Sequence, residues 1–143
     1  MKHQPVSVAV AILYQDKKFL MQLRDNIPGI LYPGYWGFFG GHMEHGETPC
    51  ATLKRELLEE INYELPATFS EFGIYSDNKV IRYVFHAPLL VQLDKLTLSE
   101  GWDIGLVPLE DVYRGNCYSA VARQMRPLGQ IHQRILLDFI EKS

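Results

Sequence analysis

The segment from Thr48 to Asn62 constrains the fold of this chain more than any other stretch, because its two ends and its periodicity all predict one helix. Thr48 can act as the N-cap, and Pro49 fits the first helical position, where the N–H that proline lacks would have no helical partner. Asn62 can end the helix, since asparagine tolerates the left-handed conformation that is common at helix ends. We therefore predict a helix that runs to about Ile61.

This predicted helix has an apolar face and an acidic face. At about 100° per residue, one stripe is apolar and should face the core; it consists of Cys50, Leu53, Leu57 and Ile61. Three glutamates fall together on an adjacent arc: Glu56, Glu59 and Glu60. The helix therefore presents three carboxylates in the same direction.

The acidic arc is unfavourable in a helix that binds no cation. A glutamate gains most from a lysine or arginine four residues later, but Glu56 has Glu60 there and Glu59 has Tyr63. Acids in the last turns also oppose the helix dipole, by roughly 0.3–1 kcal/mol each when exposed. A solvated, ion-paired helix face is the alternative that holds for most charge clusters. Clustered carboxylates are hard oxygen ligands, however, so we predict that they bind Mg²⁺ or Mn²⁺.

Composition restricts the class of protein. A length of 143 residues with 47% apolar residues fits one hydrophobic core, so we predict a single domain over residues 1–143. The net charge of −3 gives no basic footprint for nucleic acid. No apolar run approaches the ~20 residues of a membrane span, and Cys50 and Cys117 lack the spacing of zinc ligands. We expect a cytoplasmic protein, monomeric or homodimeric, with a small-molecule partner and no membrane or nucleic-acid partner.

The rest of the chain predicts a mixed fold. Apolar stretches predict strands at residues 6–13, 19–24, 79–93 and 104–109. Polar residues 14–18 predict a hairpin turn between the first two of these strands, and residues 128–142 have helical spacing. Strands with separated helices indicate the α/β or α+β class, with a mixed sheet covered on both faces.

The spacing of the charged residues resembles the Nudix box, G-x5-E-x7-R-E-U-x-E-E-x-G-U, in which U is apolar. The residues at its fixed positions up to the last glutamate are Gly41, Glu47, Arg55, Glu56, Glu59 and Glu60. Asn62 and Tyr63 replace the final glycine and the final apolar residue, and Phe39 stands where the family often has proline. The resemblance implies a Nudix-type α/β/α sandwich, with a mixed β-sheet between helices.

The resemblance also implies metal ligands and a reaction. Members of the family hydrolyse a nucleoside diphosphate linked to another group and use a divalent metal. By resemblance, Glu59 and Glu60 are metal ligands, and the backbone carbonyl of Gly40 is a further ligand. Glu56 is either a ligand or the group that orients or deprotonates the attacking water. These residues are therefore the expected catalytic core.

Other expected site residues lie around this core. Glu100, in a later loop, is the candidate for the remote acid that the family commonly uses, with an ordinary loop glutamate as the alternative. Gly41, Glu47 and Arg55 are expected to support the site, and Glu47 and Arg55 are expected to form an ion pair between loop and helix. A structural role is thus the first expectation for these three residues.

Residues for the rest of the substrate are less well determined by the sequence. Arg24, after the second strand, is a candidate for phosphate binding, and a solvated surface arginine is the alternative. Trp36 and Phe39 offer flat surfaces on which a base could stack. Side chains alternate in direction along a strand, however, so a place in the core is the alternative for both rings.

The expected substrate is a nucleoside triphosphate, cleaved to the monophosphate and pyrophosphate as in the MutT-like members that the compact chain resembles. One alternative is an ADP-ribose or nucleotide-sugar pyrophosphatase. ADP-ribose enzymes of the family often carry a proline some fifteen residues after the box, and no proline lies between Pro66 and Pro88 here. A nucleotide-binding regulator without turnover is the alternative from another class, as is a purely structural module.

Overall fold

The computed structural model describes residues 4–30 and 32–142 of the chain. It contains two compact units, each built from two separate stretches of sequence. The first unit joins the chain up to Leu13 to Phe39–Thr97, and the second joins Tyr14–Phe38 to the chain from Leu98 onward. A single domain over residues 1–143 remains a prediction, and each unit is described by itself.

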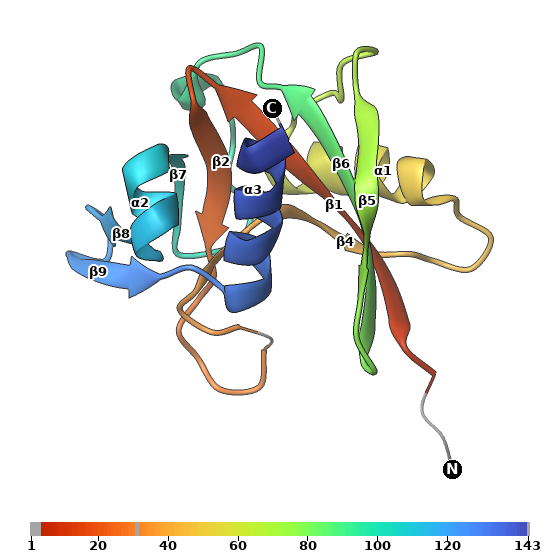
Figure 1. The fold of residues 1–143 in the computed structure, drawn as a ribbon, viewed down its shortest axis with the longest axis horizontal. Coiled ribbons are helices and arrows are strands. Elements are labelled where there is room, and N and C mark those ends of the chain that lie inside the picture. The colour runs from red at the N-terminus through yellow and green to blue at the C-terminus, as the bar shows by residue number, and fades with distance from the viewer. Residues whose placement is uncertain (1–3, 31, 143) are drawn as a thin grey trace. The chain divides into compact units, whose positions relative to one another are not determined.

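The first unit consists of strands and the helix that carries the acidic arc (Figure 1). Its elements are β1 (Val6–Gln15), β4 (Phe39–His42), α1 (Pro49–Ile61), β5 (Ser70–Ser76), β6 (Val80–Pro88) and the short 3₁₀ helix η1 (Leu93–Lys95). Only the part of β1 up to Leu13 belongs to this unit. β1 pairs antiparallel with β4, from Val8 opposite His42 to Ala11 opposite Phe39. β5 and β6 form an antiparallel hairpin, and β6 is also a neighbour of β1 in the sheet.

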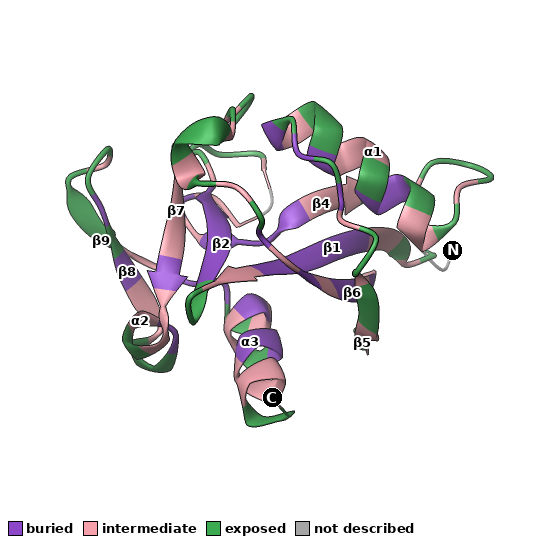
Figure 2. Cartoon of the chain, turned by 90° about the horizontal axis from the view of Figure 1, so that it is seen from above, coloured by how far each residue is buried: buried purple, intermediate pink, exposed green. Residues whose placement is uncertain are grey.

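Burial explains why β1 and α1 form the centre of this unit. Residues 9–13 of β1 are all buried, as expected of a strand covered on both faces, and Figure 2 shows this continuous burial along β1. α1 packs against β4, and its Leu53, Leu57 and Ile61 have no exposed surface. Burying a leucine or isoleucine side chain stabilises a fold by about 1.5–3 kcal/mol. The predicted apolar stripe is therefore the core face of α1, although Cys50 at its start is only partly buried.

Both predicted ends of α1 are confirmed. The side chain of Thr48 accepts a hydrogen bond from the backbone N–H of Ala51 at 3.1 Å, and Pro49 is the first helical residue. Asn62 adopts the left-handed conformation, with φ 54° and ψ 42°, and its N–H donates to the carbonyl of Leu58 at 3.1 Å. Asparagine thus serves at this helix end as glycine commonly does.

The second unit begins with the last two residues of β1. Tyr14 and Gln15 pair with β2 (Lys18–Leu23) across a turn in which Asp16 and Lys17 have φ of 51° and 61°. Two successive positive φ values are typical of the tight turns that match the twist of a hairpin. The predicted hairpin is therefore confirmed.

The remaining elements of this unit come from the end of Tyr14–Phe38 and from the chain after Leu98. They are β3 (Trp36–Gly37), β7 (Asp103–Pro108), α2 (Leu109–Arg114), β8 (Asn116–Ser119), β9 (Gln124–Pro127) and α3 (Gln130–Lys142). β2 pairs antiparallel with both β3 and β7, whereas β8 and β9 form a hairpin of their own. α3 buries Ile135 and Leu136 and brings Phe139 edge-on to Phe19 of β2, with ring centroids 6.2 Å apart.

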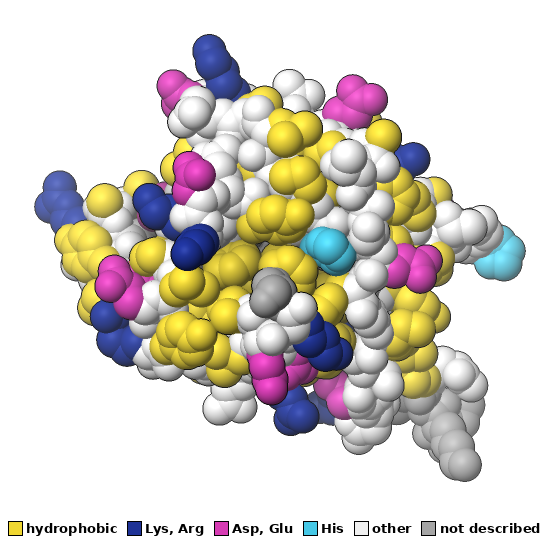
Figure 3. Space-filling view, turned by 45° about the horizontal axis from the view of Figure 1, so that its top comes forward, with side chains coloured by type: hydrophobic (Ala, Val, Ile, Leu, Met, Phe, Trp, Pro, Cys, Tyr) yellow, Lys and Arg dark blue, Asp and Glu magenta, His cyan; other side chains and the backbone are white. Residues whose placement is uncertain are grey.

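The predicted class is confirmed: the chain is a mixed α+β protein with a mixed sheet and helices packed against it. The strand predicted at 79–93 is too long, because β6 ends at Pro88, whose ring removes the N–H that a continuing strand would use. In the described part of the chain, each helix is too short or too polar to cross a bilayer. On the face drawn in Figure 3, basic and acidic side chains are interspersed, in keeping with the net charge of −3.

Candidate active site

Two of the three glutamates on α1 lie against the glycines of β4, within the first unit. The backbone N–H of Gly40 donates to Oε1 of Glu60 at 3.0 Å. A Cβ added at Gly41 would overlap the carboxyl group of Glu56, so a larger residue would force this carboxylate to move. Gly40 has a φ of +144°, and a Cβ there would overlap the backbone carbonyl of Ala9. The two glycines therefore let the acidic face approach the backbone of β4.

Arg55 connects the loop before α1 to two of the acids. Its Nε donates to Oε2 of Glu47 at 2.8 Å and its Nη2 to Oε1 of Glu47 at 3.0 Å, which is the predicted ion pair in bidentate form. Nη2 also donates to the carbonyl of His42 at 3.2 Å. Nη1 donates to Glu56 at 3.0 Å and to Glu59 at 3.3 Å. All five N–H groups of the guanidinium therefore have acceptors.

These contacts shift the pKa values of two carboxyl groups in opposite directions. Hydrogen bonds from Arg55, and next from the backbone N–H of Glu44, lower the pKa of Glu47 to about 2. Burial raises the pKa of Glu56 above its ordinary value; the contact with Arg55 opposes this shift, and the charge of Glu59 adds to it. Glu56 is therefore a carboxylate with an increased affinity for a proton, which is the property of a general base.

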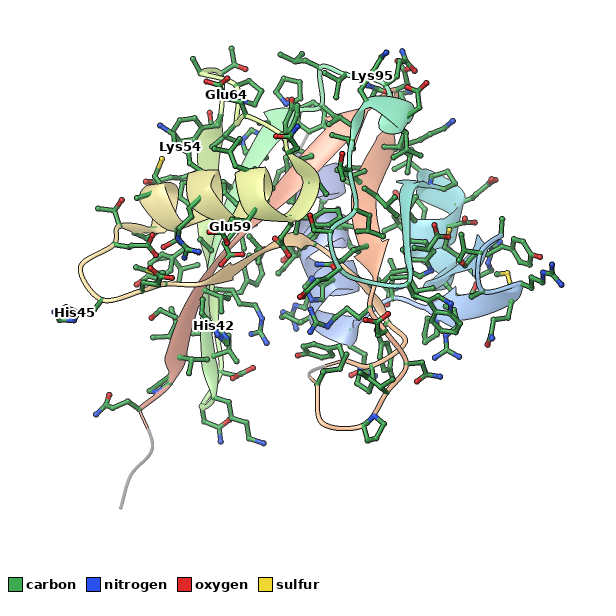
Figure 4. All side chains as sticks on the ribbon, turned by 180° about the vertical axis from the view of Figure 1, so that it is seen from behind. His42, His45, Lys54, Glu59, Glu64 and Lys95 are labelled. Carbon is green, nitrogen blue, oxygen red and sulfur yellow. The ribbon has the colours of Figure 1, made fainter. Side chains whose placement is uncertain are left out.

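Glu59 is the most exposed of the three acids, with 59% of its side chain accessible. Figure 4 shows it on the side of α1 that faces β4, whereas Lys54 extends from the opposite side of the helix. His45 stands at the tip of the loop before α1, away from Glu59. The acidic arc therefore keeps an accessible carboxylate beside two that contact the backbone of β4.

The donor atoms of this arrangement fit a hard divalent cation. Three carboxylates come from one helix face, and the backbone of Gly40 approaches them through its N–H bond to Glu60. In the side-chain positions seen here, no group of three or more His, Cys, Asp or Glu residues among those described is close enough to hold a metal ion. Glu60 accepts the backbone N–H of Gly40, and Glu56 accepts Nη1 of Arg55.

Glu100 and Arg24 belong to the second unit. Glu100 is exposed, at a bend shortly before β7. Arg24 follows β2 and is partly buried, and its backbone N–H donates to the carbonyl of Tyr35 at 3.0 Å. Because the acids of α1 belong to the first unit, the remote-acid role of Glu100 and the phosphate-binding role of Arg24 remain predictions.

Burial corrects the expectation that Trp36 and Phe39 stack on a base. Trp36 is 2% exposed and Phe39 is 1% exposed. The indole N–H of Trp36 donates to the carbonyl of Cys117 at 3.1 Å, which satisfies its polar atom inside the second unit. Both rings are therefore core residues, the alternative that strand alternation allowed, and neither presents a face to a ligand.

The second unit contains a cavity that the sequence did not indicate. It has a volume of about 650 Å³ and is lined by Tyr32, Tyr35, Arg114, Gly115, Pro127, Leu128, Gln130, Ile131 and Gln133. This volume lies in the range of small-molecule pockets. Tyr32 has a positive φ of 54°, uncommon for a bulky residue. Most of the lining comes from residues 114–133, which are remote in sequence from the two tyrosines.

Comparison with known proteins agrees with this arrangement. The sequence profile of the NUDIX domain matches residues 3–128. A MutT protein from Methanosarcina mazei is similar in structure, with TM-score 0.75 and 19% identity over 99% of this chain and 97% of that one. A MutT NUDIX hydrolase from Burkholderia pseudomallei gives TM-score 0.72 and 19% identity over 94% and 98% of the two chains. The predicted Nudix-type fold is thus confirmed.

A third similar structure carries a ligand. It is the NUDIX domain of NrtR from Shewanella oneidensis in complex with ADP-ribose, with TM-score 0.69 and 21% identity over 99% of this chain and 90% of that one. A search of curated proteins found no match. Since the profile match at residues 3–128 covers most of the 143 residues, this chain belongs to the NUDIX domain family.

Proposed function

We propose that the chain is a divalent-metal-dependent pyrophosphohydrolase that converts a nucleoside triphosphate into a monophosphate and pyrophosphate. The observation that carries this proposal is the arrangement of α1 against β4. There, Arg55 contacts both Glu56 and Glu59 through Nη1, and Gly40 contacts Glu60 through its backbone N–H. This arrangement concentrates carboxylate oxygens beside a glycine backbone, which suits a metal that also binds phosphate.

Glu56, Glu59, Glu60 and the carbonyl of Gly40 are the groups that would hold the metal. A bound Mg²⁺ or Mn²⁺ supplies neutralisation of the phosphate charge and acidification of bound water. Glu56 would either share in holding this metal or accept the proton of the attacking water, and the burial that raises its pKa supports the second role. Arg55 holds this carboxylate in orientation at 3.0 Å, and Glu47 in turn holds Arg55.

The substrate class rests on two kinds of support. The similar MutT structures favour a nucleoside triphosphate, as does the lack of a proline between Pro66 and Pro88. The ADP-ribose complex of the Shewanella domain favours ADP-ribose or a nucleotide sugar as the second candidate. Either substrate is a small nucleotide, and a monomer or homodimer remains the expectation for the assembly.

Hydrolysis of a nucleotide panel by wild type, Glu59→Gln and Glu60→Gln tests this function. Wild type should release pyrophosphate and a monophosphate from at least one triphosphate, and EDTA should abolish release, because the phosphates lose their counter-charge. Each substitution removes a charged oxygen ligand and should lower kcat by orders of magnitude. Glu64→Gln is the matched control, since Glu64 is exposed beyond the end of α1 (Figure 4).

Two results would count against the proposal. Turnover at the wild-type rate by both variants under saturating Mg²⁺ would remove the acids from the reaction. Tight nucleotide binding by wild type with no product would instead favour a regulator that binds without catalysis. ADP-ribose cleavage without triphosphate cleavage would keep the chemistry and replace the substrate.

A further inference from the structure

We propose that Thr52 is a positioning residue for the acidic site, and that its hydroxyl acts through Glu47 and Arg55. The inference rests on the proposed function, since it concerns the same site. Thr52 occupies one of the seven unspecified positions between Glu47 and Arg55 in the box, so the motif itself does not require a hydroxyl there. The assignment comes from the contacts that the hydroxyl makes.

The Thr52 side chain is fully buried and has one strong acceptor. Its Oγ1 donates to Oε1 of Glu47 at 2.8 Å, and the residue has no exposed surface. A threonine inside a helix commonly donates to a carbonyl three or four residues earlier. Here the carbonyl of Thr48 accepts the backbone N–H of Thr52 at 3.0 Å, while the hydroxyl turns to the loop carboxylate instead.

The hydroxyl contributes to a complete set of donors around Glu47. Oε1 of Glu47 also accepts the backbone N–H of Glu44 at 2.8 Å and Nη2 of Arg55 at 3.0 Å, while Oε2 accepts Nε of Arg55 at 2.8 Å. Donors from the loop and from α1 therefore fix the plane of the carboxylate. A carboxylate held in this plane presents both oxygens to the guanidinium, which is the geometry of a bidentate pair.

Arg55 transmits this orientation to the acids. The guanidinium is planar and rigid, so fixing its Nε and Nη2 edge also fixes the direction of Nη1. Nη1 is the atom that contacts Glu56 at 3.0 Å and Glu59 at 3.3 Å. The hydroxyl of Thr52 thus helps to determine where two of the three acids are held, although it contacts neither of them.

Two substitutions separate the hydroxyl from the shape of the side chain. Thr52→Val keeps the branched shape and removes the donor, whereas Thr52→Ser keeps the donor. In metal-free protein, we expect the Nε–H proton of Arg55 to exchange with water about fivefold faster in Thr52→Val than in wild type. This change in rate corresponds to the loss of one typical hydrogen bond. In the hydrolysis assay, the Mg²⁺ concentration that gives half the maximal rate should rise about tenfold in Thr52→Val. The loss of a residue that supports metal ligands typically weakens metal binding by at least this factor. Thr52→Ser should restore both values, and Thr68→Val, at an exposed site, should change neither.

The proposal is overturned if Thr52→Val matches wild type in proton exchange, or if Thr52→Ser loses as much as Thr52→Val. A double-mutant test adds a second criterion: on a Glu47→Gln background, Thr52→Val should have little further effect, and full additivity would contradict a route through Glu47. If Thr52→Val does not fold, Thr52→Ala replaces it in every comparison. The proton-exchange measurement needs no metal or substrate, so it decides the role of Thr52 even if wild type hydrolyses no nucleotide.

Discussion

Glu47 and Arg55 form a bidentate ion pair in the first unit, with two hydrogen bonds of 2.8 and 3.0 Å. The resemblance to the Nudix box implied this pair, because the two residues stand at fixed positions of the box. It did not predict that the same guanidinium reaches Glu56, since neighbouring helix residues do not usually face each other. It did not indicate Thr52 either, because the direction of a buried hydroxyl depends on a loop that folds back over the helix.

The pair makes stability depend on pH in a defined direction. The pKa of Glu47 is lowered from 4.5 to about 2 in the folded protein, mainly by Arg55. A carboxyl group with a lowered folded pKa stabilises the fold above its unfolded pKa, and this contribution is lost as the pH falls toward the folded value. The melting temperature of wild type should therefore fall between about pH 5 and pH 2 partly because Glu47 takes up a proton.

Glu47→Gln tests this contribution. We expect a lower melting temperature than wild type at pH 7 and a smaller further decrease between pH 5 and pH 2, because the neutral amide has no charge to lose. Thermal unfolding followed by circular dichroism across this range gives the comparison, with Glu64→Gln as the matched control. An unchanged melting temperature at pH 7, or an equally steep decrease in acid, would contradict the assigned role of the pair.

At the scale of elements, α1 was predictable almost to the residue because its signals are local. Thr48, Pro49 and Asn62 act on the helix ends through their own backbone and side chains, without help from distant segments. β5 was missed for the opposite reason: Ser70–Ser76 is largely exposed and contains Gly73, so its pairing with β6 decides its structure. β8 and β9, with four residues each, are too short for a periodic signal.

Asn62 offers a test of the helix end. Its φ of 54° costs little for asparagine and nothing for glycine, but about 1–2 kcal/mol for a residue with an ordinary Cβ. Asn62→Ala should therefore lower the free energy of unfolding by about 1 kcal/mol, and Asn62→Gly should leave it nearly unchanged or raise it.

Urea unfolding measures this difference, and Asn78→Ala serves as the control in a loop of ordinary backbone conformation. Equal stability of Asn62→Ala and Asn62→Gly would show that the left-handed conformation at this position does not constrain the residue. A loss confined to Asn62→Ala would show that asparagine substitutes here for the glycine of the box.

At the scale of the whole molecule, family membership follows from the box and from the fold, while the substrate does not. Composition cannot separate an aromatic residue that stacks on a ligand from one that fills the core, and Trp36 and Phe39 prove to be core. The cavity beside Tyr35 draws its lining from segments far apart in sequence, which no local pattern reveals. Glu100 and Arg24 lie in the second unit, so their part in the reaction depends on the assembled molecule.

We propose that the acids of α1 bind a divalent cation. A bound cation would explain why three carboxylates cluster near the end of α1. The helix dipole is unfavourable to negative charge there, and Arg55 offsets that charge only in part. A protein with a net charge of −3 also needs such a cation before it can hold a polyphosphate against its own carboxylates.

Titration of metal-free protein with Mn²⁺, followed by the electron paramagnetic resonance signal of the free ion, tests this claim most directly. We expect wild type and Glu64→Gln to remove Mn²⁺ from solution, and Glu59→Gln and Glu60→Gln to bind it much more weakly. Equal Mn²⁺ binding by all four proteins, or no binding by wild type, would contradict it.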